Sequence, residues 1–225
     1  MMDSPEWLIL TLLRFIIPLS ILRWPLAGII ASILADVVLS DLLGLPHGGF
    51  LHYQIWDKVL DTYYLALAAY TVLAWKDKPA RSVALFAFGY RAIGVLLFIA
   101  TENQSLLFLF PNFFENFFIF YLLFRKMVGK AKLFSSNLVF AVIITAVLLP
   151  KLAQEFFMHA AFVRPNELLG ITAPHWLNWL IPAEFNLVLP LQWLVYIAIP
   201  LTALLWRVGA LKRFLGYLGK KIEVS

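Results

Sequence analysis

The chain has no cysteine and few charged side chains: among its 225 residues, Asp, Glu, Lys and Arg together make up only 14%. The absence of cysteine excludes disulfide bonds, thiol nucleophiles and cysteine-ligated zinc. The sequence also lacks a glycine-rich phosphate loop, a Gly-x-Ser-x-Gly nucleophile elbow and a helix with paired zinc-binding histidines. Any chemistry must therefore rest on carboxylates, amides, imidazoles and basic side chains.

Hydrophobic residues are abundant, at 62% of the chain with a mean hydropathy of +0.85. Apolar runs of about 17 to 22 residues recur, which is the length needed to cross a bilayer as a helix. The runs show no alternation of apolar and polar residues, so a transmembrane barrel is disfavoured. We therefore predict an all-α, polytopic transmembrane helical bundle, a multi-pass protein of the cell membrane whose partners are membrane lipids.

The hydrophobic pattern predicts one integral membrane domain over 1–225 with about seven transmembrane helices, six being the alternative count. Proline and tryptophan mark the long connection at 151–187 as an interfacial or re-entrant segment. The predicted spans are 6–22, 25–45, 59–75, 82–100, 104–125, 133–150 and 188–206.

The net charge of +5 has a topological explanation. Most lysines and arginines fall on one side of the predicted spans, in short loops and at the C-terminus. The positive-inside rule then places the N-terminus outside and the C-terminus in the cytoplasm. Because topology accounts for the basic residues, we predict no nucleic-acid partner.

Polar residues are densest from the second predicted span into the third. This first constellation comprises Asp36, Asp41, His47, His52, Asp57, Lys58 and Asp61. Asp57 and Asp61 are four residues apart, so on a helix they project from one face, and Tyr64 continues that face. Two such carboxylates can hold a divalent cation or share a proton. Mg²⁺ or Mn²⁺ is the predicted ion, because hard cations prefer oxygen ligands.

The same acidic residues have a purely structural interpretation. Asp36 lies deep in an apolar run, where an unpaired charge costs a few kcal/mol. An ion pair of Asp36 or Asp61 with Lys58 or Arg14 would remove that cost and only stabilise the bundle.

A second constellation places Arg91 opposite a polar stripe in the fifth predicted span. Asn112, Glu115 and Asn116 are three or four residues apart, so they share one face of a phenylalanine-rich helix that must face protein or water. Pro111 starts or kinks this helix and frees a carbonyl about one turn earlier. Arg91 either pairs with Glu115 in a buried salt bridge or grips a phosphate or carboxylate.

The residues of these constellations resemble a known family. The run Leu10–Pro18 is similar to the opening span of the CDP-alcohol phosphotransferases, which exchange the CMP of a CDP-alcohol for another alcohol. Their signature is D-x2-D-G-x2-A-R-x8-G-x3-D-x3-D, and Asp36, Asp57 and Asp61 occupy its first, third and fourth aspartate positions. Arg91 resembles the family's phosphate-contacting arginine. The resemblance covers roughly the first hundred residues and implies a metal-dependent transferase.

The chain departs from this signature at several positions. Other residues stand at the second aspartate, the glycines and the Ala-Arg pair: Leu39, Ser40, Leu43, Gly44 and Tyr53. Asp41 could replace the missing ligand only if the helix end unwinds. The family works from the cytoplasmic face, whereas the charge count places this loop outside. The stretch 53–121 also resembles uncharacterised bacterial membrane proteins.

The sequence is compatible with three functions. The first is a metal-dependent enzyme acting on a phosphate-linked lipid or CDP-alcohol, with Asp61 as general base and Arg91 holding phosphate. The second is a small-solute or ion-coupled transporter. The third is a non-catalytic membrane subunit or ligand-binding protein. Glu155 and His159, four residues apart, are a weaker candidate metal pair, for which a polar edge at the membrane interface is the alternative. His175 lies beside two tryptophans and is interpreted as an interfacial anchor.

Overall fold

The computed structural model of the chain describes residues 4–42, 51–129, 140, 143–152, 198, 200, 201, 204, 205, 208 and 209. Every regular element within these residues is helical. This confirms the prediction of an all-α fold. The elements are α1 (Pro5–Ile16), the 3-10 helix η1 (Ile17–Leu22), α2 (Pro25–Leu42), α3 (Leu51–Val72), α4 (Lys78–Thr101), α5 (Ser105–Leu109) and α6 (Phe113–Val128).

Three stretches of the described chain are long and apolar enough to cross a membrane: Pro5–Leu22, Lys78–Thr101 and Ser105–Val128. They match the predicted spans at 6–22, 82–100 and 104–125. The described chain thus has the helices of a multi-pass membrane protein. The count of about seven spans and the orientation stay predictions. Most of the predicted span 188–206 and almost all of the connection 151–187 lie outside the described residues.

The predicted span 25–45 corresponds to α2 (Pro25–Leu42), whereas the predicted span 59–75 differs from the helix found. The helix α3 begins at Leu51 instead of near 59, so its first half carries polar and charged side chains. Hydropathy alone assigns such residues to a loop. They are helical because their charges are neutralised by neighbouring helices, as described below.

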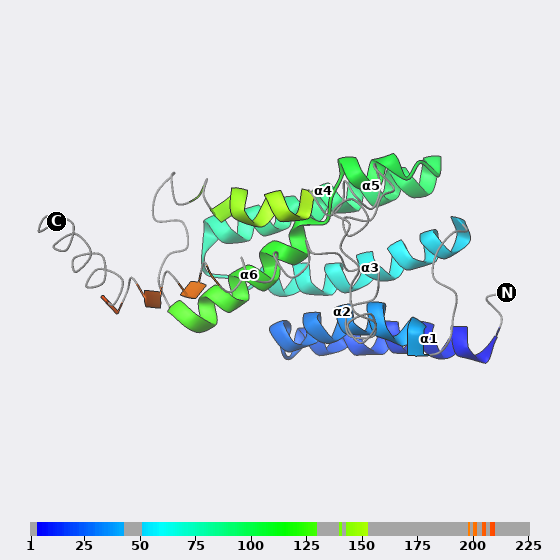
Figure 1. The fold of residues 1–225 in the computed structure, drawn as a ribbon, viewed down its shortest axis with the longest axis horizontal. Helices are drawn as coiled ribbons and strands as arrows, with labels where there is room; N and C mark the ends of the chain where they lie inside the picture. The colour runs from blue at the N-terminus through cyan, green and yellow to red at the C-terminus, as the bar shows by residue number, and fades with distance from the viewer. Residues whose placement is uncertain are drawn as a thin grey trace, which may run out of the picture.

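The helices pack around α3 (Figure 1). Helices α1 and α2 lie side by side on one side of α3 and α4 lies on the other, while α6 packs against α4, α2 and α3. The helix α2 comes close to η1 at Gly28, where a Cβ would lie 2.4 Å from the backbone nitrogen of Ile21. Only glycine leaves the room for this contact. α1 and α2 together therefore present a fixed face to α3.

The main core lies between α3, α4 and α6. Phenylalanines of α6 fill much of it, with Phe114, Phe117, Phe118 and Phe120 all buried. The indole of Trp75 stacks on the ring of Tyr121 with centroids 3.9 Å apart. Such packing gives α6 a fixed orientation. The polar stripe at the start of α6 is consequently held against α3 and α4.

Candidate functional site

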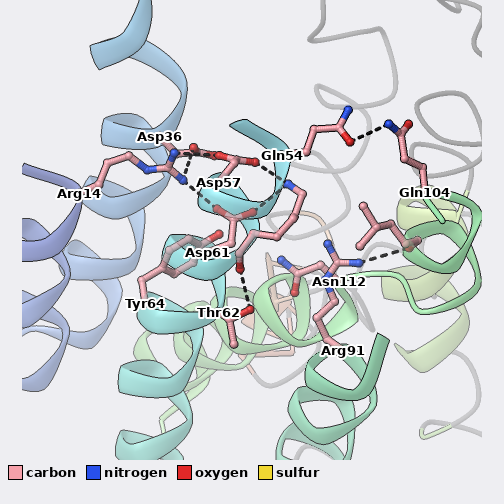
Figure 2. Close-up of polar contacts among 12 residues, drawn as sticks. Arg14, Asp36, Gln54, Asp57, Asp61, Thr62, Tyr64, Arg91, Gln104 and Asn112 are labelled. Carbon is pink, nitrogen blue, oxygen red and sulfur yellow. Dashed lines mark hydrogen bonds and ion pairs between the residues drawn. The ribbon is translucent and has the colours of Figure 1, made fainter. Parts of the chain in front are cut away.

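Three carboxylates from two helices converge beside α1 (Figure 2). Asp36 extends from α2, and Asp57 and Asp61 from successive turns of α3. One oxygen of each lies within 4.8 Å of the other two, close enough to ligate one cation. The four-residue spacing of Asp57 and Asp61 brings them to one face, as the sequence predicted. We call this set the acidic triad.

Two cations hold the acidic triad together. Nη2 of Arg14 lies 2.6 Å from Oδ1 of Asp36 and 3.0 Å from Oδ1 of Asp61, while Nη1 lies 2.8 Å from Oδ1 of Asp57. Nζ of Lys58 donates to Oδ2 of Asp57 at 2.7 Å and to Oδ2 of Asp61 at 3.0 Å. The predicted ion pairs with Arg14 and Lys58 therefore form. They join α1, α2 and α3.

The surroundings strengthen these contacts by limiting access of water. The side chain of Arg14 is only 4% exposed, and its guanidinium lies 5.0 Å from the ring centre of Trp56. Trp56 packs edge-on against Trp7 at the start of α1. Charge-assisted hydrogen bonds gain strength where the local dielectric is low. Arg14 is thus buried behind an aromatic border, while the side chain of Asp36 is 30% exposed.

The acidic triad has one more carboxylate than it has cationic partners. Three carboxylates against two cations leave one formal negative charge. Carboxylate oxygens are the ligands that hard cations take. Asp36, Asp57 and Asp61 could therefore hold a metal ion.

A second polar layer surrounds a break in the candidate span Ser105–Val128. Helix α5 ends at Leu109 and α6 starts at Phe113, so Pro111 lies in a short non-helical segment. This confirms the predicted interruption at Pro111. α4 approaches the break at Gly94, where a Cβ would lie 2.1 Å from Cβ of Phe110. The side chain of Asn112 caps α6 by accepting from the backbone N–H of Glu115.

Arg91 satisfies the backbone at this break. Its Nη1 donates to the carbonyl of Leu107 at 3.2 Å and to that of Phe110 at 2.7 Å. The freed carbonyl predicted about one turn before Pro111 is therefore present, and it accepts from Arg91. Within the described residues, no ion pair joins Arg91 to Glu115. The reason is that Glu115 instead meets Tyr64, as described below.

Replacing Arg91 by methionine should destabilise the protein by about 2 kcal/mol, because two carbonyls at the break would lose their donor. Chemical unfolding in detergent micelles measures this loss. Arg81→Met is the matched control on α4, since Arg81 makes only an exposed 3.4 Å contact with the carbonyl of Leu73. Equal destabilisation by the two substitutions would contradict the bracing role of Arg91.

Tyr64 connects the two polar layers. Its hydroxyl donates to Oε2 of Glu115, which also accepts from Nδ2 of Asn112 at 3.3 Å. Tyr64 follows Asp61 by three residues on α3, so the contact lies one turn below the triad. The face predicted from Asp57, Asp61 and Tyr64 thus runs from the triad to the start of α6.

Asn116 stands out in the second layer. Its side chain is 1% exposed, and its Nδ2 has no hydrogen-bond acceptor among the described residues. Asn112 is also buried, which confirms that the polar stripe faces the protein interior. A buried amide donor without an acceptor is costly. An oxygen-bearing group bound here, such as a phosphate or a water molecule, would satisfy it.

Other candidate residues are not placed by the structure. Asp41 lies on α2, but its side chain is outside the description, as are His47, Glu155, His159 and His175 entirely. His52 is exposed on α3.

One contact that sequence patterns did not indicate joins Gln104 to Gln54, with Nε2 of Gln104 2.6 Å from Oε1 of Gln54. The two residues are 50 positions apart in the sequence, so no local pattern indicates this contact.

Comparisons of the chain with models of known protein families, with curated proteins and with solved structures find no match. The candidate site must therefore be interpreted from its own geometry.

Proposed function

We propose that this protein is a membrane-embedded, divalent-metal-dependent enzyme that acts on a phosphate-linked substrate, a lipid or a CDP-alcohol. The convergence of Asp36, Asp57 and Asp61 within 4.8 Å carries the proposal. The resemblance to the CDP-alcohol phosphotransferases assigns these same three positions to metal ligands. Mg²⁺ or Mn²⁺ bound there would neutralise charge on a diphosphate as it reacts.

The reaction transfers a phosphoalcohol group to an acceptor alcohol. The acceptor oxygen attacks the phosphorus that carries the donor alcohol, and the bond from that phosphorus to CMP breaks. CMP departs with the bonding electron pair, and a carboxylate oxygen of Asp61 receives the acceptor's proton. The products are CMP and a phosphodiester of the two alcohols, and the reaction needs no oxidant or reductant.

Arg91 and Asn116 supply the phosphate-binding part of this proposal. The carbonyl contacts of Arg91 use only Nη1 of a guanidinium that has five N–H donors. The amide nitrogen of Asn116 is a buried donor that has no acceptor among the described residues. Both belong to the layer next to the triad, where Tyr64 links α3 to α6. A phosphate oxygen would satisfy these donors.

The test is turnover of radiolabelled CDP-alcohols or phospholipids by the full chain in nanodiscs with Mg²⁺ or Mn²⁺. Asp57→Asn should lower turnover about a hundredfold, because it removes a metal-ligating charge. Asp77→Asn is the matched control. Asp77 caps α4 by accepting from the N–H of Ala80, and asparagine caps equally well. Turnover that survives Asp57→Asn would disprove the assignment.

A second function is favoured by the closed set of contacts in the triad. Each of the three carboxylates already meets at least one cation, which is what a network that only fixes helix packing requires. In that case the protein is a non-catalytic membrane subunit. It would show no turnover with any phosphate-linked substrate, and Asp57→Asn would lower stability alone.

A further inference from the structure

The ammonium group of Lys58 lies against oxygens of Asp57 and Asp61, two of the three carboxylates of the acidic triad. Its Nζ bridges Oδ2 of Asp57 and Oδ2 of Asp61 at 2.7 and 3.0 Å. Arg14 binds the opposite oxygens of the same two carboxylates, the Oδ1 atoms. The two cations thus divide the oxygens of Asp57 and Asp61 between them, while the ion pair of Asp36 is with Arg14.

Arg14 and Lys58 differ in how readily they can leave. Arg14 reaches from α1 to carboxylates on α2 and α3 and is 4% exposed, so its departure would separate helices. Lys58 lies on α3 with both of its partners and is 18% exposed. Its side chain is a flexible four-carbon stem with a compact charge. Both of its ion pairs lie within α3, so its withdrawal breaks no ion pair between helices.

Charge balance favours exchange of Lys58 for a divalent ion. With Lys58 withdrawn, three carboxylates and Arg14 leave two formal negative charges, which one divalent cation neutralises. With Lys58 in place only one formal negative charge remains, and a divalent ion would leave this partly buried cluster positively charged. Unbalanced charge in a region of low dielectric is costly.

We propose that Lys58 is a tethered competitor of the metal ion, so that the triad accepts a divalent cation only when the Lys58 side chain withdraws. The inference rests on the metal site of the proposed function and adds its regulation. Without metal, the ammonium group keeps the carboxylates together and the site closed. With metal, the same oxygens bind the ion, and Lys58 moves toward solvent.

Mn²⁺ binding to the full chain in detergent micelles, measured by electron paramagnetic resonance, tests the proposal. Lys58→Met should bind Mn²⁺ about tenfold more tightly than the unmodified protein, because the competing charge is gone. Lys58→Arg keeps the charge and should bind no more tightly than the unmodified protein. Lys126→Met is the matched control, since Lys126 is exposed at the end of α6. Affinity that is unchanged or lower in Lys58→Met overturns the proposal.

A second measurement uses the unmodified protein and so does not depend on folding of a variant. Titration with Mn²⁺ should increase acylation of Lys58 relative to Lys126, as quantified by peptide mass spectrometry, because the displaced amine becomes accessible. Constant labelling of Lys58 across the titration overturns the proposal.

The two proposals fail differently. Tighter Mn²⁺ binding by Lys58→Met without turnover of any phosphate-linked substrate would disprove the enzyme and leave the competition intact. Turnover that depends on Asp57, together with equal Mn²⁺ affinity in Lys58→Met and the unmodified protein, would disprove the competition and leave the enzyme intact.

Discussion

Replacing Arg14 by alanine should lower the free energy of unfolding by about 3 to 5 kcal/mol, the usual cost of removing one partner from a buried ion pair. Arg14 is 4% exposed and contacts Asp36, Asp57 and Asp61 at 2.6 to 3.0 Å. Without it, Asp36 would lose its ion pair, and Asp57 and Asp61 would keep only Lys58 among the described cations. Unfolding by denaturant titration in detergent, followed by tryptophan fluorescence, measures the loss.

Two further variants show whether this cost arises from charge. Arg23→Ala removes an exposed arginine between η1 and α2 and should change stability by less than about 0.5 kcal/mol. Arg14→Ala combined with Asp36→Asn should be more stable than Arg14→Ala alone, because one uncompensated carboxylate is gone. Strictly additive losses in the double variant would contradict electrostatic coupling between Arg14 and Asp36.

The second large effect concerns the contact of α2 with η1. Gly28→Val should destabilise the protein by about 3 kcal/mol, at the upper end for overpacking. A Cβ at this position would lie 2.4 Å from the nitrogen and 2.6 Å from the Cα of Ile21. Backbone atoms cannot rotate away as a side chain can, so α2 must move away from η1. The same denaturant titration reports the change.

Gly89→Val provides the control for this substitution. A Cβ on Gly89 of α4 meets no other atom within 4 Å, so the larger side chain has space. Its stability should stay within about 0.5 kcal/mol of the original or rise slightly, because glycine is a poor helix former. A loss in Gly89→Val as large as that in Gly28→Val would mean that the close contact is not the cause.

Much of the triad was predictable because it follows local spacing. Asp57 and Asp61 share a helix face by their four-residue separation, and both lie on α3. The structural alternative named Arg14 and Lys58 as partners, and both make these contacts. An intramembrane charge requires a counter-charge, and few candidates exist in so apolar a chain. Because the chain has few charged residues, the ion pairs of the triad could be predicted from the sequence.

Contacts between side chains and backbone carbonyls were harder to predict from the sequence. The sequence showed a polar stripe opposite Arg91 and suggested a salt bridge with Glu115. Arg91 instead donates to the carbonyls of Leu107 and Phe110, because the break at Pro111 frees them. Every residue has a backbone carbonyl, so the amino-acid sequence does not show which carbonyls lack a hydrogen-bond donor. The contact of Tyr64 with Glu115 spans 51 positions and depends on how α3 packs on α6.

The start of α3 was mispredicted for a related reason. Hydropathy placed the span from 59, whereas the helix starts at Leu51 and includes Asp57 and Lys58. Hydropathy scores each residue as though it faced lipid alone. Here Asp57 meets both Arg14 and Lys58, so its charge is compensated inside the bundle. The ion pair of Asp57 with Arg14 allows α3 to include a polar segment that hydropathy assigns to a loop.

The division of the charge network among α1, α2 and α3 bears on how the protein is synthesised. The ribosome synthesises Arg14 forty-three residues before Asp57, so the first helix is made before its partners on α3. An arginine in the middle of an inserting helix costs about 2.5 to 3.5 kcal/mol on translocon scales. Pairing with Asp57 and Asp61 would offset this cost, so we expect the first helix to be stably inserted only once the third has been synthesised.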